Sequence, residues 1–280
     1  IRFTNSATSD TLRYVIIENN GTTAAQGSVT IGATGTNTGI VISNNDIRDA
    51  VGGTTGVPSS AVYSNSANNN TITVSNNNIY NWTASGVLFT TVGNGCTVSG
   101  NNIYQTAARS TALVGVSIAA GSNHTVSSNN FYQTSGTNTS SYTAISVTGN
   151  GNNQTINNNS IGGAAVNRSG SPMSNTTTFN GIILAAGTTT TSNIQGNTLS
   201  NLNISGGSSQ TYKGISVTAG NVNIGTTSGN IFGGAASVYD TIRANFDDDQ
   251  ISYTGSNTVD IENNTIANVS YYNAGGDRTC

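Results

Sequence analysis

The sequence predicts an all-β chain wound into a β-solenoid, and three observations lead to that prediction. Asn, Ser, Thr and Gly make up more than half of the 280 residues, only 7% are charged, and there are two prolines and no long helix-forming run. Aliphatic residues nevertheless recur throughout the chain, in short segments with a period of two. The same segments return every 24 to 38 residues, a range typical of solenoids.

The repeat is clearest where "TVSNNNIYNW" at 73–82 returns as "TVSGNNIYQT" at 97–106 and "TVSSNNFYQT" at 125–134. In each copy an asparagine stands two residues before an aliphatic or Phe residue that we expect to point inward. Eight positions share this place: Asn45, Asn77, Asn101, Asn129, Asn159, Asn197, Asn230 and Asn264. We interpret "IIENNG" at 16–21 as a degenerate earlier copy, with Asn20 in the same place.

A strand pattern precedes most of these asparagines. It reads "AVYS" from Ala61, "GVLF" from Gly86, "GVSI" from Gly115, "AISV" from Ala144, "GIIL" from Gly181, "GISV" from Gly214 and "QISY" from Gln250. The strand begins 14–16 residues before the asparagine in every copy, whereas the distance from that asparagine to the next strand varies from 9 to 22. We therefore expect eight to nine coils in a single domain spanning 1–280, with one constant side and one side that carries insertions.

The asparagine pairs have a structural explanation. Asn tolerates the left-handed backbone region better than other residues with a Cβ, and its amide can bond nearby backbone. Coils stacked about 4.8 Å apart would also let successive amides bond one another. We predict an asparagine ladder that shapes the coil and binds no ligand.

The order Gly-Ile-x-Val, polar turn, Val-x-x-Asn-x-Ile resembles the right-handed parallel β-helix repeat family over nearly the whole chain. The resemblance implies a right-handed parallel β-helix with an asparagine ladder. Within that family, the Asn/Thr/Gly-rich copies are most similar to secreted surface proteins of Bacteroidota-type bacteria, which implies an extracellular or cell-surface location. Pectate lyases, polygalacturonases and phage tailspikes share the fold, so the fold alone assigns no function.

Catalysis is disfavoured by the acidic residues. There are only eleven, and none pairs with another at equivalent places on adjacent coils. The one cluster is "NFDDDQ" at 245–250, where Asp247 and Asp249 would share a face and are weak candidates for Ca²⁺. His124 aligns with Ile72, Cys96 and Gln154 at a partly buried place without a catalytic partner. We expect no catalytic residue and no cofactor, and a polysaccharide lyase or hydrolase is the least favoured alternative.

Two surfaces are candidates for binding. Tyr80, Tyr104 and Tyr132 each follow an inward residue, so they should face outward on three successive coils, where they either pack across coils or bind glycan rings. The insertions 162–180, 200–213 and 233–249 should gather on one side, where loops usually carry partner contacts. These insertions contain Arg168, Tyr212, Lys213, Tyr239, Asp240, Arg243 and the run Asp247–Asp249. A protein interface is the first expectation there, and a cell-surface glycan is the second.

The net charge of −3, with scattered arginines, disfavours nucleic acid, and no apolar stretch approaches the ~20 residues of a membrane span. Cys96 and Cys280 lie about six coils apart, too far to pair within one chain, and Cys96 should point inward. Both ends of the chain have strand patterns without a cap. We therefore predict a structural, surface-assembly protein that stacks end to end with copies of itself or continues into further coils, with a glycan-binding adhesin as the alternative.

Overall fold

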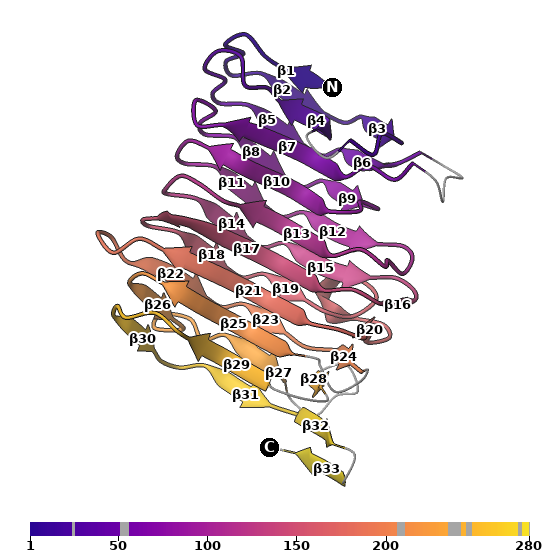
Figure 1. The fold of residues 1–280 in the computed structure, drawn as a ribbon, viewed down its shortest axis with the longest axis vertical. Coiled ribbons are helices and arrows are strands. Elements are labelled where there is room, and N and C mark those ends of the chain that lie inside the picture. The colour runs from indigo at the N-terminus through magenta and orange to yellow at the C-terminus, as the bar shows by residue number, and fades with distance from the viewer. Residues whose placement is uncertain are drawn as a thin grey trace.

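The computed structural model describes residues 1–23, 26–50, 56–205, 211–234, 242–244, 248–273 and 276–279. Its strands form three long sheets in which every neighbouring pair is parallel (Figure 1). Each turn of the chain adds one strand to each of these sheets, so the described residues make nine coils. The first coil lies at the top of Figure 1 and the last coil near the bottom. The predicted right-handed parallel β-helix is confirmed.

Sheet 1 contains the strands that the sequence pattern predicted. In spatial order they are β1 (Arg2–Phe3), β4 (Gly27–Ile31), β7 (Ser60–Ser66), β10 (Ser85–Val92), β13 (Leu113–Ile118), β17 (Tyr142–Gly151), β21 (Phe179–Ala186), β25 (Tyr212–Ala219) and β29 (Asp248–Tyr253). All seven expected strand segments, from "AVYS" to "QISY", fall within strands of this sheet.

Sheets 2 and 3 lie on either side of the ladder asparagines. Sheet 2 is β2 (Thr11–Arg13), β5 (Val41–Ser43), β8 (Thr73–Ser75), β11 (Thr97–Ser99), β14 (Thr125–Ser127), β18 (Thr155–Asn157), β22 (Ser192–Gln195), β26 (Val222–Ile224) and β30 (Val259–Ile261). Sheet 3 is β3 (Ile16–Asn19), β6 (Asp46–Asp49), β9 (Asn78–Tyr80), β12 (Asn102–Gln105), β15 (Asn130–Gln133), β19 (Ser160–Ile161), β23 (Thr198–Leu199), β27 (Ile231–Gly233) and β31 (Thr265–Ala267).

The variable side of the coils carries a fourth sheet, and its first strand among the described residues belongs to the fifth coil. Sheet 4 is β16 (Thr137–Asn138), β20 (Met173–Asn175), β24 (Leu202–Ile204), β28 (Ile242–Ala244), β32 (Val269–Asn273) and β33 (Gly276–Thr279). Strands β20, β24 and β28 come from the three long insertions and pair with one another, so the predicted gathering of those insertions is confirmed for their described part. A 3₁₀ turn, η1 (Val166–Arg168), belongs to the first of these insertions.

In-register pairing turns the coil pattern into columns of buried side chains. Val62, Val87 and Val116 stack on sheet 1, and Ile79, Ile103 and Phe131 stack on sheet 3, all fully buried. Each such side chain contributes about 1.5–3 kcal/mol through burial. The interior is thus a set of continuous apolar columns rather than a centre surrounded by layers.

In the turn before sheet 3, one residue adopts the left-handed backbone conformation and the next residue makes the ladder hydrogen bonds. At seven of the eight ladder positions the residue before the asparagine lies in the left-handed region, with φ between 54° and 66°: Asn44, Asn76, Gly100, Ser128, Asn158, Gly196 and Asn263. Gly229, before Asn230, is the exception. The ladder asparagines themselves are not in that region. The prediction that one asparagine provides both the left-handed turn and the ladder hydrogen bonds is therefore wrong. The repeat therefore reads Asn-Asn, Gly-Asn or Ser-Asn because the first residue turns the backbone and the second bonds.

The assignment of Asn20 to the ladder is wrong. Ile17 pairs with Ile47, so Val15 is the residue at the place of Asn45 in the first coil. The Val15 N–H donates to Asn45 Oδ1 at 3.2 Å, as the ladder N–H groups do elsewhere. Ile17 is the buried anchor of this coil, and Asn20 follows the strand instead of preceding it.

Candidate interaction surfaces

The asparagine ladder runs without a break from Asn45 to Asn264. At each step one Nδ2 donates to the Oδ1 of the next ladder residue at 2.9–3.0 Å. Asn129 is representative: its Oδ1 accepts from Asn101 Nδ2 and Asn101 N, and its Nδ2 donates to Val98 O and Asn159 Oδ1. Every polar atom of the side chain is bonded inside the protein, so this ladder has no group left for a ligand.

A second ladder faces outward on sheet 3. Asn78 Nδ2 donates to Asp46 Oδ1 at 2.7 Å, and Asn102 and Asn130 continue the column with bonds of 3.0 and 3.1 Å. These residues each follow a ladder asparagine directly, which explains the "NNI" and "NNF" triplets. The first Asn points inward and the second outward, because neighbouring residues of a strand face opposite sides of the sheet.

The predicted outward tyrosines form a stack beside this column. The ring centroids of Tyr80 and Tyr104 lie 4.7 Å apart, those of Tyr104 and Tyr132 lie 4.6 Å apart, and the planes are within 16° of parallel. At the first end Arg48 donates to Tyr80 Oη at 2.7 Å and forms an ion pair with Glu18. The hydrogen bond to Tyr80 is the largest of the causes that raise the pKa of Arg48.

The other end of the tyrosine stack is covered by an insertion. Tyr132 is only 8% exposed, and the neighbouring turn η1 anchors itself through Asn167 N, which donates to Asn130 Oδ1 at 3.1 Å. Burial raises the pKa of Tyr132 to about 12. Aromatic residues bind sugars through a ring face, and here the faces lie against one another. The geometry favours cross-coil packing for these tyrosines.

His124 and Cys96 lie inside the coil at the place that the alignment predicted. Both are buried, and the Cys96 N–H donates to His124 Nδ1 at 3.1 Å, which makes Nδ1 an acceptor and leaves Nε2 to donate to Ala120 O. Desolvation lowers the pKa of His124 and raises that of Cys96 to about 11. Both side chains are therefore uncharged at neutral pH, and their contacts are those of structural residues.

The predicted partner surface on the insertions needs one correction. Tyr212 is fully buried inside the coil, where it stacks on Phe179 with centroids 6.0 Å apart. It belongs to the first position of β25, so the strand extends further than its "GISV" pattern indicated. Lys213 is half-buried and Asp249 is exposed, while Arg168 donates to Ser160 and Ser200.

The remaining candidates of this surface lie beyond the described atoms. Tyr239, Asp240 and Asp247 fall outside the described residues, as does Cys280, and Arg243 is described only through its place in β28. In the described part of the chain, no three His, Cys, Asp or Glu side chains come together in a metal-binding group. The candidate Ca²⁺ pair includes Asp247, which lies outside the described residues, so that pair stays a prediction.

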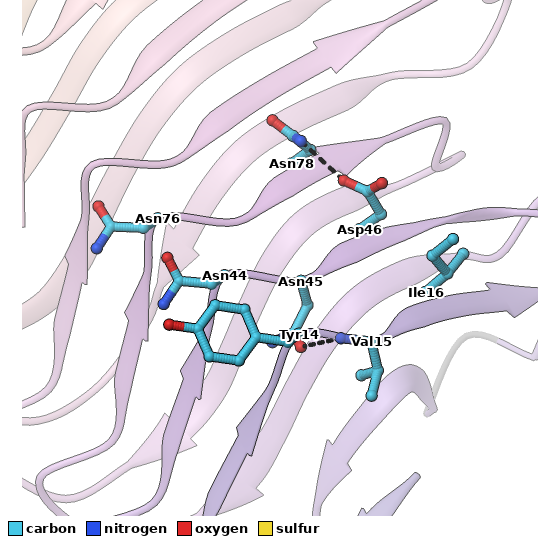
Figure 2. A pocket seen from close by; sticks show the side chains of 8 residues that line it. All are labelled: Tyr14, Val15, Ile16, Asn44, Asn45, Asp46, Asn76 and Asn78. Carbon is cyan, nitrogen blue, oxygen red and sulfur yellow. Dashed lines mark hydrogen bonds between the residues drawn. The ribbon is translucent and has the colours of Figure 1, made fainter.

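The first coil exposes an apolar cluster next to a hollow of about 330 Å³ (Figure 2). Tyr14 is 74% exposed and Ile16 is 64% exposed, and Val15 between them is also exposed. Figure 2 shows Tyr14 in one column with Asn44 and Asn76, the residues of the left-handed turn. Tyr14 has φ 58°, a backbone region that costs about 1–2 kcal/mol for a residue with a Cβ. The hollow offers only neutral amides and Asp46, which already accepts from Asn78.

The last coil has the corresponding exposed side chains. Ile261 is 48% exposed and Ile266 is 52% exposed, although the residues before them in their columns, Ile224 and Phe232, are fully buried. β29, β30 and β31 are the last strands of sheets 1 to 3, whereas sheet 4 ends in the antiparallel β32–β33 hairpin. The two end coils therefore differ from the seven between them in having one open face.

Comparisons of the chain with known protein families, curated proteins and solved structures find no match. The fold assignment therefore rests on the structure, and the likeness to Bacteroidota surface proteins stays a prediction from the sequence. Among the residues that the structure describes, no helix has the length and apolar character needed to cross a membrane.

Proposed function

We propose that this chain is a structural β-helix of a bacterial extracellular or cell-surface assembly, in which copies stack end to end or the helix continues into further coils of a longer protein. The observation that carries the proposal is the distribution of exposed apolar side chains. Among the described residues eight large apolar side chains are exposed, and four of them lie in the first coil and two in the last: Ile1, Tyr14, Val15, Ile16, Ile261 and Ile266. Ile16 belongs to the outward column of Asp46, whereas Ile261 and Ile266 continue inward columns and lie on the open face of the last coil. This apolar surface and the unpaired strand edges at both ends favour the addition of further coils.

The ends of a solenoid are different surfaces, so contact between them is heterologous. A heterologous contact that does not close into a ring continues as a filament. The resemblance to secreted surface proteins supports the extracellular location, and the polar, weakly charged flanks agree with a role exposed to solvent. In the tyrosine stack, which was the candidate glycan surface, the ring faces lie against one another.

The test is the state of the purified 280-residue chain as its concentration rises. Light scattering coupled to size exclusion should give masses that increase in steps of one chain, and negative-stain electron microscopy should show rods of variable length and constant width. A mass that stays at one chain up to millimolar concentration would contradict the proposal.

A pair of substitutions assigns the contact to the end face. Ile266→Lys places a charge on the open face of the last coil and should abolish the rods. Val166→Lys makes the same change on η1, on the flank of the helix, where the side chain is 39% exposed. The flank variant should assemble like the unmodified chain. Equal loss in both variants would indicate a general solubility effect instead of an end contact.

A further inference from the structure

The internal coils specify the register in which two copies would meet. We infer that the first coil of one copy docks on the last coil of another in the register of the internal repeat, so that Arg13 lies over Glu262. This inference rests on the proposed function, because it describes the junction that end-to-end stacking requires. The partner is a second copy of this chain, and Arg13 and Glu262 are residues through which the two copies recognise each other.

Sheet 2 supplies the ionic contact. Its outward column passes through Arg13, Ser43, Ser75, Ser99, Ser127, Asn157 and Gln195. Pairing of β22 with β26 and of β26 with β30 places Gly225 and then Glu262 next in this column, one residue after the paired Ile224 and Ile261. One further coil at the same spacing places the next copy's Arg13 about 4.8 Å from Glu262, measured between backbones. Both side chains are exposed in the single chain and have opposite charge.

The apolar columns continue across the same junction. Leu12 heads the column that ends in Ile261, and Ile17 heads the column that ends in Ile266. On sheet 1, Phe3 heads the column that ends in Tyr253. Docking in this register therefore covers the most exposed apolar residues of the last coil with apolar residues of the first, which is the match that internal neighbours make.

The charges of the two faces are complementary beyond this one contact. Strands β1 and β2 bring Arg2 and Arg13 to the open face of the first coil, where Glu18 is already paired with Arg48 and Asp10 is the remaining acidic residue. At the last coil, the acidic side chains of Asp249, Asp260 and Glu262 are exposed. This arrangement favours head-to-tail contact over contact between two like faces.

Sheet 4 fits the same arrangement. The β32–β33 hairpin occupies the last edge of sheet 4, and the described residues of the first four coils add no strand to this sheet. The incoming first coil therefore brings strands for sheets 1 to 3, which are the three sheets whose last edge is open.

One position is mismatched at the junction, and it offers a sharp test. At every internal step the backbone N–H of a ladder residue donates to the Oδ1 of the next ladder asparagine. Asn264 would meet Val15, which has no such oxygen. Val15→Asn should supply it and extend the ladder through the junction, strengthening association by roughly fivefold.

The deciding experiment measures association of the chain by sedimentation equilibrium with charge-reversed variants. Arg13→Glu and Glu262→Arg should each weaken association by roughly tenfold, and the chain that carries both changes should regain it, because opposite charges again face each other. Both positions are exposed, so circular dichroism should show an unchanged fold.

Cross-linking provides a second measurement of the register, in a Cys280→Ser background. Cys96 is buried with a raised pKa and does not compete for oxidation. Arg13→Cys combined with Glu262→Cys should form intermolecular disulfides, whereas Arg13→Cys combined with Asp260→Cys should not, because a shift of two residues separates the Cα atoms by about 8 Å.

The outcomes separate this inference from the proposed function. Failure of the unmodified chain to associate at all would overturn both. Association that responds to Ile266→Lys, but not to charge reversal or to Val15→Asn, would leave end-to-end stacking in place and overturn this register. Disulfides from the shifted cysteine pair would do the same.

Discussion

Two aromatic stacks, one in each half of the chain, differ in the side of the wall on which they lie. Tyr80, Tyr104 and Tyr132 stack outside sheet 3, with centroids 4.6–4.7 Å apart. Tyr142, Phe179 and Tyr212 stack inside sheet 1, with centroids 5.5–6.0 Å apart, and all three are fully buried. Parallel in-register coils place identical positions on top of one another, so stacking is common to both. The two stacks differ in which of the two alternating sets of strand positions they occupy. One set faces solvent and the other faces the core.

The outer stack ends where the return segments lengthen. Gly162 follows Ile161 at the place that Tyr132 occupies one coil earlier, and its φ of 122° turns the chain away from sheet 3 into η1. A side chain at Gly162 would bring its Cβ within 1.9 Å of Ser200 O, so the outer column cannot continue there. The inner ladder continues through the same coils without change. The inner asparagine ladder is thus constant through these coils, whereas the exterior changes with the insertions.

Removal of the central ring from the inner stack should have the largest effect. Phe179→Ala leaves a cavity between Tyr142 and Tyr212 in a packed interior, and should lower the free energy of unfolding by about 3–5 kcal/mol. Tyr104→Ala is the matched change in the outer stack, and should cost about 0.5–1.5 kcal/mol, because the site is open to solvent. Urea denaturation followed by circular dichroism measures both. Equal costs would contradict the assignment of the two stacks to opposite sides of the wall.

Loss of an amide should also destabilise the chain more in the inner asparagine ladder than in the outer one, by a smaller difference than in the aromatic stacks. Asn129→Ala removes a buried amide that makes four hydrogen bonds, and should destabilise the chain by about 1–3 kcal/mol. Asn102→Ala removes an outward amide whose neighbours can bond water instead, and should cost about 0.5 kcal/mol or less. Urea midpoints of the two variants test the ladder, and an Asn129→Ala chain that unfolds like the unmodified protein would show that the inner amides do not hold the coils together.

The smallest expected effect is the response of stability to acid. The pKa of His124 is lowered in the folded chain, chiefly by desolvation, so the unfolded chain binds this proton more readily. The contribution of His124 is therefore complete above its unfolded pKa of about 6.5 and is lost as the pH falls through the lower folded value. His124→Gln provides the control, because Gln154 occupies the same place one coil later. The unmodified chain should lose stability between pH 7 and pH 5 relative to this variant, and parallel pH profiles would count against an uncharged interior at this position.

The sequence by itself determined the coil and the ladder. Asn45 to Asn264 and the strand segments from "AVYS" to "QISY" were identifiable because each coil must bury the same positions and bond the same amides, which repeats local chemistry at a nearly regular spacing. It also placed Tyr80, Tyr104 and Tyr132 outside and His124 and Cys96 inside, because alternation along a strand is a local property.

Only the tertiary structure decided the features that depend on the neighbouring coil. Tyr212 had been assigned to an insertion, but pairing with Phe179 draws it into β25 and the core. Val15 occupies the ladder position of the first coil because Ile17 pairs with Ile47, although Val15 is not an asparagine. The left-handed turn falls on the residue before the ladder asparagine at seven of the eight positions, and the described parts of the insertions join into sheet 4. All four features depend on the register between neighbouring coils. Register is a cooperative property of stacked backbones, and no single repeat contains it.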